Sequence, residues 1–170
     1  MMAWWEGRLG ATWRDTEWPG IMAVQIDPIA ASVCAVVVCR ACEPGFYAYG
    51  HAAAGSFHAA CERAIVELAR SEYVLRRYWL ARRLVDGTAM TQPAGLFERR
   101  CLFFSTPAGH AGFLARVRAG AANPAGRAQP EVVFDGEIPG PWSEYASVWR
   151  VVLRPVSAEF LADREDYFFW

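Results

Sequence analysis

The pattern of apolar positions predicts two neighbouring strands followed by a long helix. Apolar residues alternate loosely over 21–26, and the run over 33–39 is almost wholly apolar and rich in valine, as in a strand buried on both faces. After residue 55 the apolar positions recur every three or four residues, at Phe57, Cys61, Ile65, Leu68, Leu75 and Trp79. This spacing predicts one helix, with Ser56 as its cap and a stop near Asp86–Gly87.

The second half of the chain shows shorter elements. Residues 101–104 are an apolar run typical of a short strand, and Ser105-Thr106-Pro107 predicts the start of a helix that continues to about residue 119. Two further strands are expected over 131–134 and 147–153, separated by glycine and proline residues.

These elements predict an α+β fold with a mixed or antiparallel sheet and helices packed on one face. A length of 170 residues suits a single domain over 1–170. The Trp-rich segment 1–20 is expected to pack on the body through its aromatic side chains, and the Ala/Gly/Pro-rich segment 120–130 is expected to be a flexible loop.

Charge and composition exclude several function classes. The net charge of −1 gives no basic field of the kind that attracts nucleic acids or membranes, so neither partner is expected. All 17 basic residues are arginine, which excludes lysine-based phosphate binding and Schiff-base chemistry. The N-terminus lacks a signal-peptide pattern, and five cysteines at irregular spacing do not form a secreted disulfide framework. We therefore expect a cytoplasmic protein with reduced thiols.

A charged cluster on the long helix is one candidate site. Glu67 lies one turn from both Arg63 and Arg70, and such a carboxylate can hold a divalent cation that bridges nucleotide phosphates. The alternative is a set of ion pairs on an exposed helix face. Small residues, including Ser71, continue this face and would allow close approach of a ligand or a backbone.

The same region resembles the helix of YcaO-type proteins. The resemblance rests on a Gly-bounded turn from Tyr49-Gly50 to Gly55-Ser56, followed by a helix with Ala59-Ala60, Arg63-Ala64, Glu67 and Arg70. Residues 145–155 also resemble the late strand of that family, which runs into a proline turn. Arg70 stands where the family has glutamine or glutamate, and the sequence shows no second Glu-x-x-Glu-Arg helix. The resemblance therefore implies the later part of such a domain.

The resemblance implies ATP-dependent modification of peptide backbone amides, giving azolines or thioamides during ribosomal peptide maturation. It implies ATP and Mg²⁺ as cofactors, with Glu67 as the metal and nucleotide carboxylate. The cofactor-binding residues would be Glu67, Arg70, Arg63, Ser71, Gly50, Gly55 and Ser56. Because only half of the site is present, a cyclodehydratase-like activity would need a partner, so we expect a peptide substrate or partner protein and a homo- or hetero-oligomer.

Two other functions are compatible with the sequence. Cys39-x-x-Cys42 followed by His58-x-x-Cys61 has a spacing suited to a structural zinc ion in a small zinc-stabilised module. Alternatively, the chain is a non-catalytic accessory protein that binds a peptide or partner through exposed aromatics, including the terminal run Tyr167 to Trp170. Nothing in the sequence pairs a cysteine with a histidine as a catalytic unit, and His110 is expected on the surface of its helix.

Overall fold

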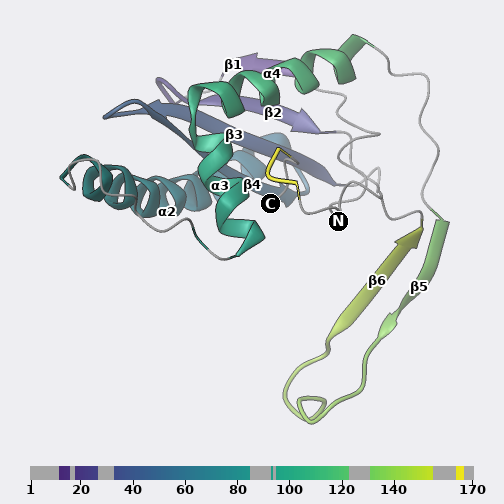
Figure 1. Ribbon diagram of the computed structural model, residues 1–170. Helices are drawn as coiled ribbons and strands as arrows, with labels where there is room; N and C mark the ends of the chain where they lie inside the picture. Colours follow the sequence, from purple (N-terminus) through teal and green to yellow (C-terminus); the bar gives the residue numbers. More distant parts are fainter. Residues whose placement is uncertain are drawn as a thin grey trace.

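The computed structural model describes residues 12–15, 18–26, 33–84, 93, 95–122, 131–154 and 164–166. Within these residues the main sheet is four-stranded and antiparallel, with strand order β1-β2-β3-β4 (Figure 1). Its strands are β1 (Thr12–Asp15), β2 (Met22–Ile26), β3 (Cys34–Cys42) and β4 (Phe46–Ala54). The predicted pair of neighbouring strands, β2 and β3, is confirmed.

Strand β4 occupies the region predicted as a Gly-bounded turn, so that prediction is wrong. β4 pairs with β3 along its whole length, from Cys34 opposite Ala54 to Cys42 opposite Phe46. The turn is confined to the residues between these strands, where the amide of Gly45 donates to the carbonyl of Cys42 at 2.8 Å. Gly45 has a φ of 107°, a conformation that favours glycine. The many alanines of β4 conceal its alternating pattern.

The helices are α2 (Phe57–Leu84), α3 (Leu96–Ser105) and α4 (Pro107–Ala122). The predicted caps are confirmed: Ser56 Oγ accepts from the amide of Ala59 at 3.2 Å, and Thr106 Oγ1 accepts from the amide of Gly109 at 3.1 Å. The predicted strand over 101–104 is wrong, because these residues belong to α3. Arg100 and Phe104, spaced by one helical turn, are among its buried positions.

The core consists of two clusters on opposite faces of the sheet. Val36 and Val38 of β3 pack with α2, whose buried contributors are Ala60, Cys61, Ala64, Leu68 and Leu75. The alternate residues Val37 and Cys39 pack with Tyr49 and with Phe104, Phe113 and Val117 from α3 and α4. The predicted α+β class with an antiparallel sheet is confirmed. α2 covers one face, and α3 and α4 add side chains to the other.

A separate hairpin follows the helices. β5 (Glu131–Glu137) and β6 (Trp149–Arg154) pair with each other, with a register shift between Val132 and Phe134. Figure 1 shows this hairpin, in green and yellow-green, extending away from the main sheet. Both predicted strands are confirmed. Among the described helices, none combines the length and apolar character needed to cross a membrane.

Several predicted segments fall outside the described residues. Of the N-terminal segment, only β1 and residues 18–20 are described, and α4 continues to Ala122 at the start of the predicted loop. The terminal aromatic run from Tyr167 lies outside them. Just before it, residues 164–166 lie against α3, where Arg100 Nε donates to the carbonyl of Arg164 at 2.7 Å.

Candidate ligand pocket

A cavity of about 430 Å³ lies between β4, α2 and α3. Among the described strands, β4 lies at one end of the main sheet, and α2 lies across its face. The lining comprises Tyr49, Gly50 and His51 from β4; Glu67, Arg70, Ser71, Val74, Leu75 and Tyr78 from α2; Phe97, Glu98, Cys101 and Leu102 from α3; and Pro93.

The position of α2 against this wall depends on Gly50. A Cβ atom at residue 50 would overlap the carbonyl oxygen of Ala64 and the amide nitrogen of Leu68. Ala60 and Ala64 are both fully buried on the inner side of α2. Small residues on both elements therefore let the helix backbone approach the strand backbone, and this brings the next turns of α2 over the cavity.

One side of the cavity is polar. Arg70 Nη1 donates to Glu67 Oε1 at 2.7 Å, and both side chains keep access to solvent. His51 is half-buried beside them. Burial lowers the pKa of His51, and the charge of Glu67 opposes this shift. The imidazole is therefore neutral at pH 7, and the cationic group on this side of the cavity is the Arg70 guanidinium.

The remainder of the wall is mainly apolar. Val74, Leu75 and Leu102 line it together with the rings of Tyr78 and Phe97. Cys101 also lines the cavity, but burial, and secondarily the charge of Glu98, raises the pKa of its thiol to about 11. A protonated thiol is a poor nucleophile, so this environment does not activate Cys101.

Four of the predicted cofactor-binding residues line this cavity: Gly50, Glu67, Arg70 and Ser71. The other three lie outside it. Arg63 is exposed and donates to the carbonyl of Ala53 at 3.4 Å, and Gly55 and Ser56 are exposed at the start of α2, where Ser56 acts as the cap.

Sequence reasoning missed several lining residues, because their elements were not predicted. His51 belongs to β4, and Phe97 and Glu98 belong to α3. The alternation of Tyr47, Tyr49 and His51 was the available signal for a strand in this region.

The structure does not bring the four predicted zinc ligands together. Cys39 faces the cluster shared with α4, whereas Cys42 and Cys61 belong to the cluster beneath α2. His58 is exposed, where it stacks on Trp18 and pairs with Glu62 at 3.4 Å. Within the described residues, no three His, Cys, Asp or Glu side chains are grouped as metal ligands would be.

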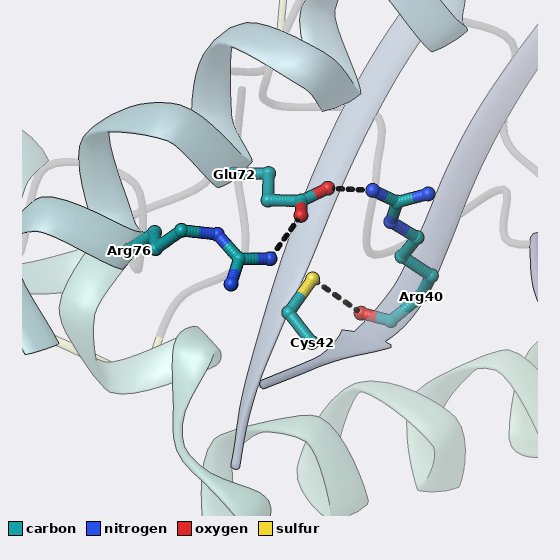
Figure 2. Close-up of polar contacts among 4 residues, drawn as sticks. All are labelled: Arg40, Cys42, Glu72 and Arg76. Atoms are coloured by element: carbon teal, nitrogen blue, oxygen red, sulfur yellow. Dashed lines mark hydrogen bonds and ion pairs between the residues drawn. The ribbon is translucent and has the colours of Figure 1, made fainter. Parts of the chain in front are cut away.

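A second polar cluster joins α2 to β3. Figure 2 shows the Glu72 carboxylate between two guanidinium groups, with Arg40 on one oxygen and Arg76 on the other at 2.6 Å. Cys42 lies beside them and donates its thiol to the carbonyl of Arg40 at 3.7 Å. Burial raises the pKa of Glu72, but hydrogen bonds from Arg76 and Arg40 outweigh this, so the pKa is lowered overall. Glu72 is an ionised link between helix and sheet.

His110 on α4 is buried, contrary to the prediction that it lies on the helix surface. Its Nδ1 lies 2.6 Å from the phenol oxygen of Tyr49, and its ring stacks on Tyr47 with centroids 3.7 Å apart. Burial lowers the pKa of His110 and raises that of Tyr49. Both groups are therefore neutral, and the pair anchors α4 to β4. His110 shares a helix face with the buried residues Phe113 and Val117, and this spacing was the available signal for its burial.

Comparison with known proteins finds no significant match to a family model, to a curated protein or to a solved structure.

Proposed function

We propose that the cavity between β4, α2 and α3 binds an adenine nucleotide with Mg²⁺. The observation that supports this is the meeting of Glu67 and Arg70, two residues on which the YcaO resemblance rests, at the side of an apolar cavity with aromatic walls. The volume of about 430 Å³ lies within the usual range for small-ligand sites.

The two parts of the cavity match the two parts of such a ligand. Tyr78 and Phe97 offer flat apolar surface to an adenine ring. Arg70 presents a planar guanidinium to phosphate oxygens, and its side chain is 72% exposed, so it can reach a ligand without unfolding its surroundings. In this arrangement the phosphate takes the place of Glu67 on the guanidinium.

The cavity lining includes two carboxylates that could serve as magnesium ligands. Glu67 on α2 and Glu98 on α3 are both lining residues. Mg²⁺ commonly binds one or two carboxylates together with water and substrate phosphates, so this oxygen donor set is suitable. When bound, the ion would neutralise phosphate charge, and the role of Glu67 would be to hold it beside Arg70.

The wider activity proposed is ATP-dependent modification of peptide backbone amides. The resemblance covers one Glu-bearing helix, α2 with Glu67, where the resembled family uses two such helices. We therefore propose that the chain provides the nucleotide-binding half of a site, which a partner completes for a peptide substrate.

Nucleotide binding is tested by calorimetric titration of ATP with Mg²⁺ into the wild type and two variants, Arg70→Ala and Glu67→Ala. Loss of a charge-assisted hydrogen bond of about 1.5–3 kcal/mol should weaken ATP binding about tenfold or more in Arg70→Ala. Glu67→Ala should greatly reduce the dependence of affinity on Mg²⁺.

Matched controls are Arg118→Ala on α4 and Glu62→Ala on α2, both exposed and outside the cavity lining. These variants should bind ATP as the wild type does. Adenosine, which lacks phosphates, should bind the wild type and Arg70→Ala equally. Wild-type protein that binds no ATP, or Arg70→Ala that binds it unchanged, would contradict the proposal.

A further inference from the structure

The hairpin of β5 and β6 exposes an unusual amount of apolar surface. Its side chains with 39–87% exposure are Val132, Val133, Phe134, Trp142, Tyr145, Val148, Trp149 and Val151. An isolated two-stranded hairpin is marginally stable in water, and exposed apolar patches of this kind mark interaction sites. The hairpin is therefore a candidate docking element.

The hairpin is also acidic. Residues 131–154 carry four carboxylates, Glu131, Asp135, Glu137 and Glu144, and two arginines. All four acidic residues are exposed, and Asp135 also accepts from Trp149 Nε1 at 2.6 Å. A surface that fits this hairpin should combine apolar side chains with positive charge.

The outer face of α2 has these properties. Arginine alternates with apolar residues at helical spacing along one stripe, which we call the α2 stripe: Arg63, Val66, Arg70, Tyr73, Arg77 and Leu80. Its apolar members are 46–61% exposed, and its arginines are exposed as well. Residues 73–84 contain four arginines and no acid. The stripe is basic and apolar where the hairpin is acidic and apolar.

The two surfaces also match in length. From Val66 to Leu80 the helix rises about 21 Å, and the strand β5 extends over about 23 Å. Figure 1 shows the hairpin well away from α2 of the same chain. With the hairpin in this position, only the hairpin of another copy can reach the α2 stripe.

We propose that the hairpin of one copy of this chain docks on the α2 stripe of a second copy. Exchange in both directions gives a two-fold symmetric dimer with two identical contacts. Arg70 and the neighbouring Val74 also line the cavity, so the hairpin of the second copy would border the cavity opening. The proposal does not depend on nucleotide binding, and its test uses the protein without nucleotide.

Charge exchange provides the test. Arg77→Glu places a negative charge in the α2 stripe, and the double substitution Glu137→Arg with Glu144→Arg makes the hairpin basic. Each variant alone brings like charges together in both contacts of its dimer. In a mixture of the two, one contact of the hybrid dimer is native, and the other regains an opposite-charge pair at residue 77.

The measurement is sedimentation equilibrium with circular dichroism as a check of folding. We expect a wild-type dimer that weakens as salt rises from about 0.05 to about 0.5 M. Each variant should form at least tenfold weaker dimers, and the mixture should dimerise more tightly than either variant alone. Arg118→Glu on α4 should dimerise as the wild type does. A monomeric wild type, variants that dimerise normally, or a mixture no tighter than its components would each overturn the proposal.

Discussion

Gly50 of β4 lies against the backbone of α2 at Ala64, in a contact with no room for a side chain. Because the obstructing atoms belong to a helix backbone, they cannot move aside as a flexible side chain would. We expect Gly50→Ala to lower the free energy of unfolding by about 3 kcal/mol, through overpacking of a buried contact. Chemical denaturation at constant pH measures this change.

Gly112 on α4 provides the control for this substitution. A Cβ atom there meets nothing within 4 Å, so Gly112→Ala should raise stability by about 0.5–1 kcal/mol through helix propensity. Equal effects of the two substitutions would show that the close approach of α2 to β4 is incorrect.

The Glu72 carboxylate should stabilise the junction between α2 and β3. Glu72→Gln keeps the size of the side chain but leaves Arg40 and Arg76 without their counter-charge. Because both guanidinium groups are partly exposed, water offsets some of this loss, and we expect a cost of about 1–2 kcal/mol. A double-mutant cycle with Arg40→Ala should show that the two substitutions are not additive.

The contribution of the Glu72 carboxylate to the free energy of unfolding depends on pH. Since the pKa of folded Glu72 lies below its ordinary value of 4.5, its contribution is complete above that value and is lost as the pH falls through the folded pKa. The free energy of unfolding can be measured from denaturation curves between pH 7 and pH 3. The difference in this free energy between Glu72→Gln and the wild type should be largest at pH 7. A difference that grows on acidification would contradict this assignment.

His110 should make the protein less stable in mild acid. Its folded pKa is lowered by burial below the ordinary value of 6.5, so the unfolded chain binds the proton more readily. Stability is then full above about pH 6.5 and falls as the pH drops below it. The free energy of unfolding, measured between pH 8 and pH 5, should show this slope.

The double variant Tyr49→Phe with His110→Phe removes both hydrogen-bonding partners and the titrating group together. It should be close to neutral in stability at pH 8 and should have a shallower slope below pH 6.5. His51, whose pKa burial also lowers, contributes to the slope that remains. An unchanged slope would mean that the pKa of His110 does not differ between the folded and unfolded states.

The cavity thiol should be slow to react. With a pKa of about 11 against an ordinary 9.0, Cys101 has about one-hundredth of the thiolate of a normal cysteine at pH 8. Alkylation by iodoacetamide, followed by peptide mass spectrometry, should show Cys101 modified at least tenfold more slowly in the native protein than in denaturant. Rapid native modification would indicate that the thiol is more exposed than its place between Glu98 and Leu102 allows.

Local sequence signals are sufficient for much of this fold. Ser56 and Thr106 each cap a helix that their side-chain chemistry predicts, and the apolar run of β3 identifies the central strand. These signals succeed because a cap or a buried strand is specified by residues that are adjacent in sequence.

The missed elements depend on contacts between distant residues. Gly50 suggests a turn when its neighbours alone are considered, but it is required by the backbone of α2, which is not visible in the local pattern. Residues 101–104 resemble a strand in isolation, and only the burial of Arg100 and Phe104 reveals the helical period of α3. The sequence therefore predicts the α2 wall of the cavity, through Glu67, Arg70 and Ser71, and only Gly50 of the β4 wall. The α3 wall is not predicted.

The order of strands in the main sheet has a consequence for folding. Each strand from β1 to β4 pairs with its neighbour in sequence, and α2 follows directly and packs on β3 and β4. Such local connections need little loop closure and favour rapid folding. During synthesis, the strands β1 to β4 can therefore pair and receive α2 on one face first, and α3 and α4 then cover the other face. The acidic hairpin emerges from the ribosome last of these elements, so the α2 stripe is exposed before it to an already completed copy of the chain.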